Sequence, residues 1–117
     1  MAQIQPSPAR TKTNTFLSES AVLLANADLV VFDVPMAEGI SIQTSGISSD
    51  EATVEVSLEG DPTNWIQIFD SEGANPFAQQ DNIQFLSFDT LSKVRVTRSG
   101  GSDGDITVIL AQGIRPN

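Results

Sequence analysis

Hydrophobic and polar residues alternate along much of this chain, most regularly in the stretch ATVEVSLE at 52–59. Every even position from 52 to 58 is apolar and every odd position from 53 to 59 is polar. A repeat of two residues is that of a β-strand with one buried and one wet face. The turn sequence Gly-Asp-Pro-Thr-Asn follows at 60–64, and the chain resumes at Trp65 with WIQIF. This stretch therefore predicts two strands joined by a turn.

Shorter apolar or alternating segments predict further strands before and after this unit. They lie at 20–24, 28–34, 40–45, 83–88, 93–98 and 106–111. The first of them could instead be a single helical turn capped by Ser18 or Ser20. Ala25-Asn-Ala is a plausible hairpin turn after it, and SGGSDGD at 99–105 is a glycine-rich turn before the last strand.

Eight short strands, with turn signals about every 8–12 residues and no long helical repeat, predict an all-β domain. We expect an antiparallel β-sandwich, jelly-roll-like, rather than a closed barrel. Residues 1–15 contain two prolines and only Ile4 as a sizeable apolar side chain. They are expected to form an extended or flexible N-terminal arm, followed by a single sandwich domain at 16–117.

Composition narrows the range of functions. The 117 residues include no cysteine, histidine or tyrosine, so disulfides, thiolate metal sites and the usual general base near neutral pH are absent. We therefore expect no enzyme activity and no metal or cofactor. The net charge of −9 argues against binding to nucleic acid or to an anionic membrane. The N-terminus has no apolar run typical of a signal peptide, and no segment approaches the length of a membrane span.

The acidic residues suggest one metal alternative. Asp103 and Asp105 in the glycine-rich turn, with Asp61 in another turn, could surround a calcium ion with oxygen ligands. Aspartate and glycine are also the residues that hairpin turns prefer, and the EF-hand spacing is missing. No spacing among the carboxylates marks a catalytic acid and base.

Trp65, the only tryptophan, has three interpretations. It could be a core residue at the edge of the sandwich, a platform on which a sugar ring stacks, or part of a subunit interface together with Phe69. The choice depends on which face of the strand is buried, because Trp65 and Phe69 lie opposite Ile66 and Ile68.

Basic residues form two small groups. Lys93, Arg95 and Arg98 lie on one predicted strand, where Lys93 and Arg95 share the outward face. They are expected to meet acidic side chains of the same molecule or of a neighbour. Arg10 and Lys12 are the only charged residues among the first 15, and could meet an acidic surface of a neighbouring subunit.

Two segments, VEVSLEGDPTNWIQI and SKVRVTRSGGSDGDITVIL, resemble parts of small β-sandwich virion proteins of tailed bacteriophages. The first resembles their strand, Asp/Gly turn, Asn-Trp, strand unit. The second resembles their final hairpin, with a basic strand, a Gly/Ser/Asp turn and a last apolar strand. Together the matched residues, about 52–69 and 92–111, make up about a third of the chain.

The resemblance implies a structural protein of the virion, with capsid decoration or cement as its role. Such a protein binds the outside of the head, often as a homotrimer, and bridges major capsid proteins. It carries no catalytic residues. The partner-binding residues expected are Arg10, Lys12, Lys93, Arg95 and Trp65. The alternatives are a tail, neck or fibre component of the virion, and a carbohydrate-binding module with Trp65 as its platform.

Overall fold

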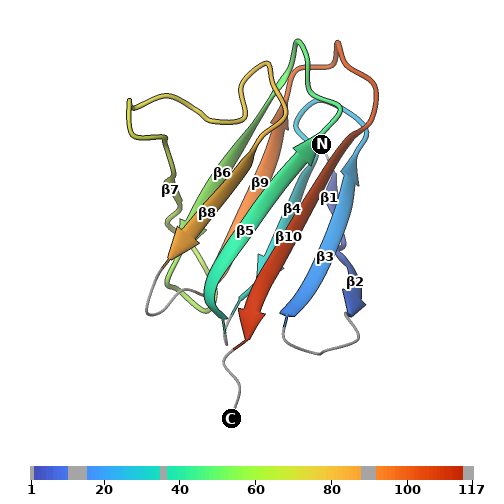
Figure 1. Cartoon of the computed structure of the whole chain (residues 1–117). Helices are drawn as coiled ribbons and strands as arrows, with labels where there is room; N and C mark the ends of the chain where they lie inside the picture. Colours follow the sequence, from blue (N-terminus) through green and yellow to red (C-terminus); the bar gives the residue numbers. More distant parts are fainter. Residues whose placement is uncertain (1, 11–15, 35–36, 88–91, 115–117) are drawn as a thin grey trace.

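Two five-stranded β-sheets pack face to face in the computed structural model, which describes residues 2–10, 16–34, 37–87 and 92–114 (Figure 1). Sheet A contains, in spatial order, β1 (Gln3–Ile4), β4 (Leu29–Asp33), β9 (Lys93–Ser99), β6 (Glu51–Ser57) and β7 (Ile66–Gln67). Sheet B contains β2 (Ser7–Arg10), β3 (Phe16–Leu23), β10 (Ile106–Ile114), β5 (Ala37–Ser45) and β8 (Ile83–Ser87). All pairings are antiparallel except that of β1 with β4, which is parallel.

The chain alternates between the two sheets along most of its length. From β3 onward, β3, β5, β8 and β10 belong to sheet B, whereas β4, β6, β7 and β9 belong to sheet A. Two layers that share eight consecutive strands in this way form a double-sheet jelly roll. The predicted fold class, an antiparallel jelly-roll-like sandwich, is therefore confirmed.

Two turns that were predicted to close hairpins instead carry the chain from one sheet to the other. The turn at 25–27 leads from β3 in sheet B to β4 in sheet A, and the turn at 99–105 leads from β9 in sheet A to β10 in sheet B. Turn residues report a reversal of the chain but not which strand pairs with which. The unit β6–turn–β7 is a true hairpin, with Val56 paired to Ile66. The segment at 20–24 is mostly strand rather than a helical turn.

Part of the predicted N-terminal arm belongs to the sandwich. β1 pairs with β4 and β2 pairs with β3, so the described residues 3–4 and 7–10 add an edge strand to each sheet. The Leu29 N–H donates to the Ala2 carbonyl at 2.8 Å, and Ile4 packs against the core. An extended segment can form backbone hydrogen bonds at open sheet edges without a core of its own. Residues 3–4 and 7–10 therefore belong to the sandwich, although the domain was expected to begin at residue 16.

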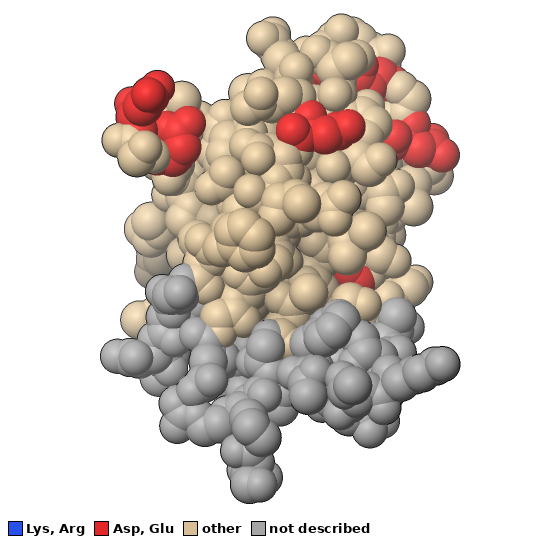
Figure 2. Space-filling model, viewed as in Figure 1, with Lys and Arg blue, Asp and Glu red and all other residues tan. Residues whose placement is uncertain are grey.

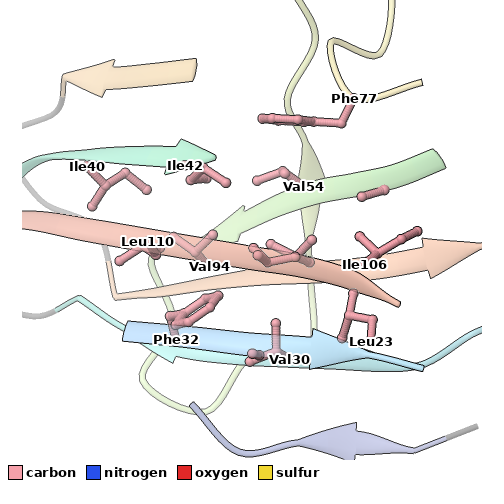
Figure 3. Packing of buried hydrophobic residues seen from close by; sticks show 14 of the residues in the cluster. Leu23, Val30, Phe32, Ile40, Ile42, Val54, Phe77, Val94, Ile106 and Leu110 are labelled. Carbon is pink, nitrogen blue, oxygen red and sulfur yellow. The ribbon is translucent and has the colours of Figure 1, made fainter. Parts of the chain in front are cut away.

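The core lies between the sheets and is built from the inward residues of the alternating strands, as the labelled side chains in Figure 3 show. Phe32 and Val30 come from β4, Ile42 from β5 and Leu110 from β10. Phe77 is also fully buried, although it lies in the connection 70–82, DSEGANPFAQQDN, most of whose residues are polar. The Ala52 N–H donates to the Phe77 carbonyl at 3.1 Å, and this bond holds the loop against β6.

Candidate functional site

The outer face of sheet B carries no charged side chain among its described residues. Strand register identifies these residues, because Ser41 pairs with both Ala111 and Phe85, and Ile109 pairs with both Ser20 and Gln43. Residues two positions apart on a strand lie on the same face. We call the resulting surface the neutral face; its described side chains are Ser7, Ser18, Ser20, Val22, Ser41, Gln43, Ser45, Ile83, Phe85, Thr107, Ile109 and Ala111.

Large apolar side chains are exposed on the neutral face. Phe85 is 75% exposed, Ile83 46% and Val22 39%. Figure 2 views the molecule from this side and shows uncharged atoms across its middle, with acidic side chains mainly at the upper end. The chain carries a net charge of −9, yet none of its 15 acidic residues lies among the described residues of this face.

The outer face of sheet A, in contrast, carries ion pairs. The guanidinium of Arg95 donates from Nε and Nη2 to Glu55 Oε1, at 3.1 and 2.8 Å. The Lys93 ammonium donates to the Asp33 carboxylate on the neighbouring strand. Lys93 and Arg95 do share the outward face, as predicted, and both meet acidic side chains of their own molecule.

Trp65 lies beside Arg95 on this same face. The Arg95 guanidinium carbon is 4.5 Å from the centroid of the Trp65 ring, which is the geometry of a cation–π contact. Glu55 pairs with Gln67, so the residues of the Trp65 strand that share the face of Gln67 point outward. Trp65 is therefore a half-buried residue of the outer face and not of the core. One face of its ring is covered by Arg95 and is closed to a stacking sugar.

A shallow groove of about 280 Å³ lies at the end of the β6–β7 hairpin. Leu58, 70% exposed, and Ile66, 68% exposed, form its apolar wall. The remaining lining residues are Val56, Ser57, Glu59 and Asn64. Its volume is at the lower limit of small-molecule sites, which hold roughly 300–1,000 Å³. The groove contains one carboxylate, Glu59, whose Oε1 accepts hydrogen bonds from the Thr63 and Asn64 N–H groups of the turn.

Arg98 was grouped with Lys93 and Arg95 from the sequence, but it points inward and is only 1% exposed. Its Nη2 donates to Asp50 Oδ2 at 2.9 Å and to the Asp103 carbonyl at 2.7 Å. Its Nη1 donates to the Leu23 carbonyl at 2.8 Å, and its Nε to the Gly100 carbonyl at 3.0 Å. Arg98 therefore joins both sheets and two loops at one end of the sandwich.

The Asp103 carboxylate completes this loop cluster. It accepts hydrogen bonds from the backbone N–H groups of Ser48, Ser49 and Asp50 and from the Ser48 hydroxyl, at 2.7–3.1 Å. These donors, the Ser48 N–H first, hold the pKa of Asp103 far below its usual range. The Asp103 N–H in turn donates to Asp50, whose pKa is also lowered. Asp103 is thus a structural acceptor and not a free calcium ligand.

Other carboxylates have the same role in their loops. Asp28, Asp81 and Asp70 each accept hydrogen bonds from two or more backbone N–H groups of turns, with donors at Ala2, Leu24, Ala25, Gly46, Ile47, Glu72 and Ala74. Within the described residues, no three acidic side chains come together in a way that could hold a metal ion. The described part of the chain also has no helix long and apolar enough to cross a bilayer.

The pKa of one carboxylate, Glu19, is shifted upward instead of downward. Glu19 accepts a hydrogen bond from Gln112 Nε2 at 3.2 Å, on the inward side of sheet B. Burial, together with the nearby charge of Asp33, raises the pKa of Glu19. Gln112 Nε2 also donates to the Asp33 carbonyl at 3.0 Å, so the group connects the two sheets as a polar contact within the sandwich.

The five residues predicted to bind partners fall into two groups. Lys93, Arg95 and Trp65 come together on sheet A, as described above. Arg10 ends β2, where it pairs with Leu17, and Lys12 lies outside the described residues. The neutral face was not among the predicted sites. Its strands β3, β5, β8 and β10 were predicted, whereas β2, which carries Ser7, was expected to belong to the arm. The face exists only because these strands share one sheet.

Comparison with known proteins identifies the fold but no family. No protein-family model matches the chain, and no curated protein matches its sequence. The periplasmic inhibitor of g-type lysozyme PliG from Aeromonas hydrophila is similar in structure, with a TM-score of 0.52, 10% identity and coverage of 98% of this chain and 100% of that chain. The copper-binding protein CorA from Methylomicrobium album BG8 is also similar in structure, with a TM-score of 0.51 and 7% identity. The match covers 97% of this chain and 100% of CorA.

Hydroxypropylphosphonic acid epoxidase from S. wedmorenis is also similar, with a TM-score of 0.52 and 13% identity. The match covers 89% of this chain and 47% of that chain, so the chain spans about half the length of the epoxidase. The three proteins differ in what their names say they do. At such identities the likeness concerns the sandwich fold alone.

Proposed function

We propose that the protein is a structural component of a bacteriophage virion, of the capsid decoration type, which binds the outside of the head and bridges major capsid subunits. The neutral face is the observation that carries this proposal. A decoration protein works by adhesion, and adhesion needs a flat surface that can be desolvated without burying unpaired charge.

The chemistry of the neutral face suits such a contact. Its serine and threonine hydroxyls and the Gln43 amide can donate and accept hydrogen bonds, while Phe85, Ile83 and Val22 offer apolar area. Aromatic residues are enriched and charged residues depleted in the centre of protein interfaces. Many copies on a symmetric shell multiply a modest contact into stable binding.

The carboxylates support an adhesive rather than a catalytic role. Asp28, Asp50, Asp81 and Asp103 hold loop N–H groups, so their oxygens are already occupied by structural hydrogen bonds. A general acid or base must reach a substrate with a free oxygen. These aspartates therefore hold the loops of the sandwich in place.

Two lysine substitutions test the neutral face. Ser41→Lys places a charge at the centre of that face, and Thr53→Lys places the same charge on the outer face of sheet A; both residues are half-buried in a central strand. Each variant is mixed with heads that lack the protein, and bound copies are counted by gradient sedimentation and electron microscopy. We expect Ser41→Lys to lower occupancy at least about tenfold and Thr53→Lys to leave it unchanged. Equal occupancy for both would refute the role of the face.

The arm contributes a second contact in this proposal. Arg10 and Lys12 carry the only charges of the first 15 residues and would meet acidic groups of a capsid subunit. Replacing both with glutamine should lower the affinity and weaken its dependence on salt. An unchanged salt dependence would remove the two residues from the contact.

A structural component of the tail, neck or fibre would use the same adhesive surface. Copy number distinguishes it, since hundreds of copies per particle place the protein on the head and a handful place it on the tail. A carbohydrate-binding role gains less support, because Arg95 covers one face of the Trp65 ring.

A further inference from the structure

β8 is an open edge of sheet B. Sheet B has the order β2-β3-β10-β5-β8, so one side of β8 pairs with β5 and the other side has no strand beside it among the described residues. The strand reads IQFLS and contains neither a charge nor a proline. Edge strands in soluble proteins usually carry such protection against unwanted pairing.

The register shows which backbone groups point away from the sheet. The Thr44 N–H donates to the Asn82 carbonyl, so this pair is hydrogen-bonded, and hydrogen-bonded pairs then recur at every second residue. Gln84 and Leu86 therefore bond to β5, while the N–H and C=O of Ile83 and Phe85 face the open side. The Ile83 N–H is held by the Asn82 side chain at 2.8 Å, which leaves Phe85 as the free centre of the edge.

The other edges of the two sheets are protected. β2, at the far side of sheet B, contains Pro8, which cannot donate a hydrogen bond. β1 and β7, the edges of sheet A, are only two residues long. β8 is thus the one edge of the described structure that combines length, neutrality and an unprotected backbone, and it borders the neutral face.

We propose that two copies of the chain associate by antiparallel pairing of β8 with β8 about a two-fold axis at Phe85. In this register Phe85 lies opposite Phe85 of the second copy, and Ile83 lies opposite Ser87. The Phe85 N–H of each copy donates to the Phe85 carbonyl of the other. The two sheets B become one continuous sheet, and the two neutral faces become one surface.

Three features favour a second copy over a foreign strand. First, β8 itself carries no charge, so two copies that meet at this edge place no like charges opposite each other within the paired strands. Second, the two-fold pair satisfies both open edges at once, whereas an added foreign strand would itself leave a new edge. Third, the register centred on Phe85 stacks two aromatic side chains that are each 75% exposed in a single chain.

This pairing goes beyond the virion role and does not depend on it, because it concerns only the contact between two copies. It also gives a different stoichiometry from the trimer that the sequence resemblance implies. Native mass therefore separates the two: the pair has twice the mass of one chain, and a trimer three times.

The test measures native mass by sedimentation equilibrium for the full chain and for two lysine variants. Phe85→Lys places two like charges at the axis, and Ser20→Lys adds the same charge to the neutral face on β3, away from β8. We expect two-chain mass for the unaltered protein and for Ser20→Lys, and an increase of about tenfold or more in the dissociation constant for Phe85→Lys. A one-chain or three-chain mass for the unaltered protein would overturn the proposal, as would a Phe85→Lys variant that pairs normally.

Two further measurements keep the result clear if Phe85→Lys fails to fold. Phe85→Pro removes the outward N–H and the aromatic ring but no backbone bond to β5, since those bonds use Gln84 and Leu86, and it should also prevent pairing. In the unaltered protein, hydrogen exchange at the Phe85 amide should be slow at high concentration and fast after dilution, while the Gln84 amide stays protected in both. Fast exchange at Phe85 in both conditions would overturn the proposal.

Discussion

Arg98 and Asp50 form an ion pair of 2.9 Å whose two side chains are only 1% and 3% exposed. The pair joins the end of β9 to the loop before β6, and each of its members accepts or donates further hydrogen bonds to the loop 100–103. Removal of one partner from a buried ion pair is strongly destabilising, because the other charge stays buried without compensation. The pair therefore controls how the loops at this end of the sandwich are arranged.

Arg98→Met should lower the free energy of unfolding by about 3–5 kcal/mol, because it leaves the Asp50 charge and three backbone carbonyls without their donor. Arg95→Met, which breaks an ion pair on the outer face of sheet A, should cost no more than about 1 kcal/mol. Urea unfolding followed by Trp65 fluorescence measures both. Equal losses for the two variants would contradict the structural role of Arg98.

Gly100→Ala should destabilise the protein by about 1–3 kcal/mol. Gly100 has a φ of +104°, and a Cβ at this position would collide with the Asp50 carboxylate. Gly104→Ala is the matched control, because a Cβ at Gly104 meets no atom within 4 Å, and its effect should stay within about 0.5 kcal/mol. Thermal unfolding of the two proteins at the same pH gives the comparison.

The lowered pKa of Asp103 should make the folded protein less stable in acid. This pKa is far lower in the folded protein than the ordinary value of 3.8, so below about pH 4 the unfolded chain binds more protons than the folded one. The contribution of Asp103 is present above that pH and declines as the pH falls. Asp103→Asn should therefore unfold more easily at pH 6 but show a shallower decline between about pH 4 and pH 2. Parallel pH profiles for the two proteins would contradict this account.

Deletion of residues 1–10 should destabilise the sandwich, in contrast to what a free arm would do. The deletion removes both edge strands and the Ile4 side chain, whose burial is worth up to about 3 kcal/mol. It also exposes the β3 and β4 edges. The variant should melt at a lower temperature than the full chain. An unchanged melting temperature would mean that β1 and β2 detach readily in solution.

Arg95 should shield Trp65 from solvent. Arg95→Met removes the cation that covers the ring, so quenching of Trp65 fluorescence by acrylamide should increase. Lys93→Met is the control, because it breaks the neighbouring ion pair with Asp33 and leaves Trp65 untouched. Equal quenching in the two variants would show that the ring is accessible from its other side.

The strands were predictable because alternation is a local property of the sequence. In KVRVTR, the inward positions Val94 and Val96 extend by the same repeat to Arg98, so the sequence did contain a signal that Arg98 is buried. Alternation alone does not establish a buried arginine, because a charged residue is rarely fully buried unless it is paired, and the sequence does not show which acidic residue is the partner of Arg98. Phe77 gave no such signal, since it stands alone in a polar loop and is buried only because the loop folds over the edge of β6.

The surfaces were harder to predict because they depend on strand order. Ser41, Phe85 and Ala111 lie side by side but are separated in sequence by tens of residues. Their shared face follows from which strands pair, and a turn sequence does not specify whether the chain stays in one sheet or crosses to the other. The pairing of Lys93 and Arg95 with acids of their own molecule likewise required the register of β4, β6 and β9.

The absence of ionisable groups on the neutral face has a consequence for the conditions under which it can act. Ions in solution weaken attractions between charges, and protons change the charge of carboxylates and amines, but hydroxyl, amide and hydrocarbon groups carry no charge to be screened or titrated. A contact made through Ser41, Gln43 and Ile109 would hold equally well in dilute and in concentrated salt, and in mildly acidic and mildly alkaline surroundings. The strength of a contact through the neutral face therefore does not depend on charged groups of that face, although the whole molecule is strongly negative.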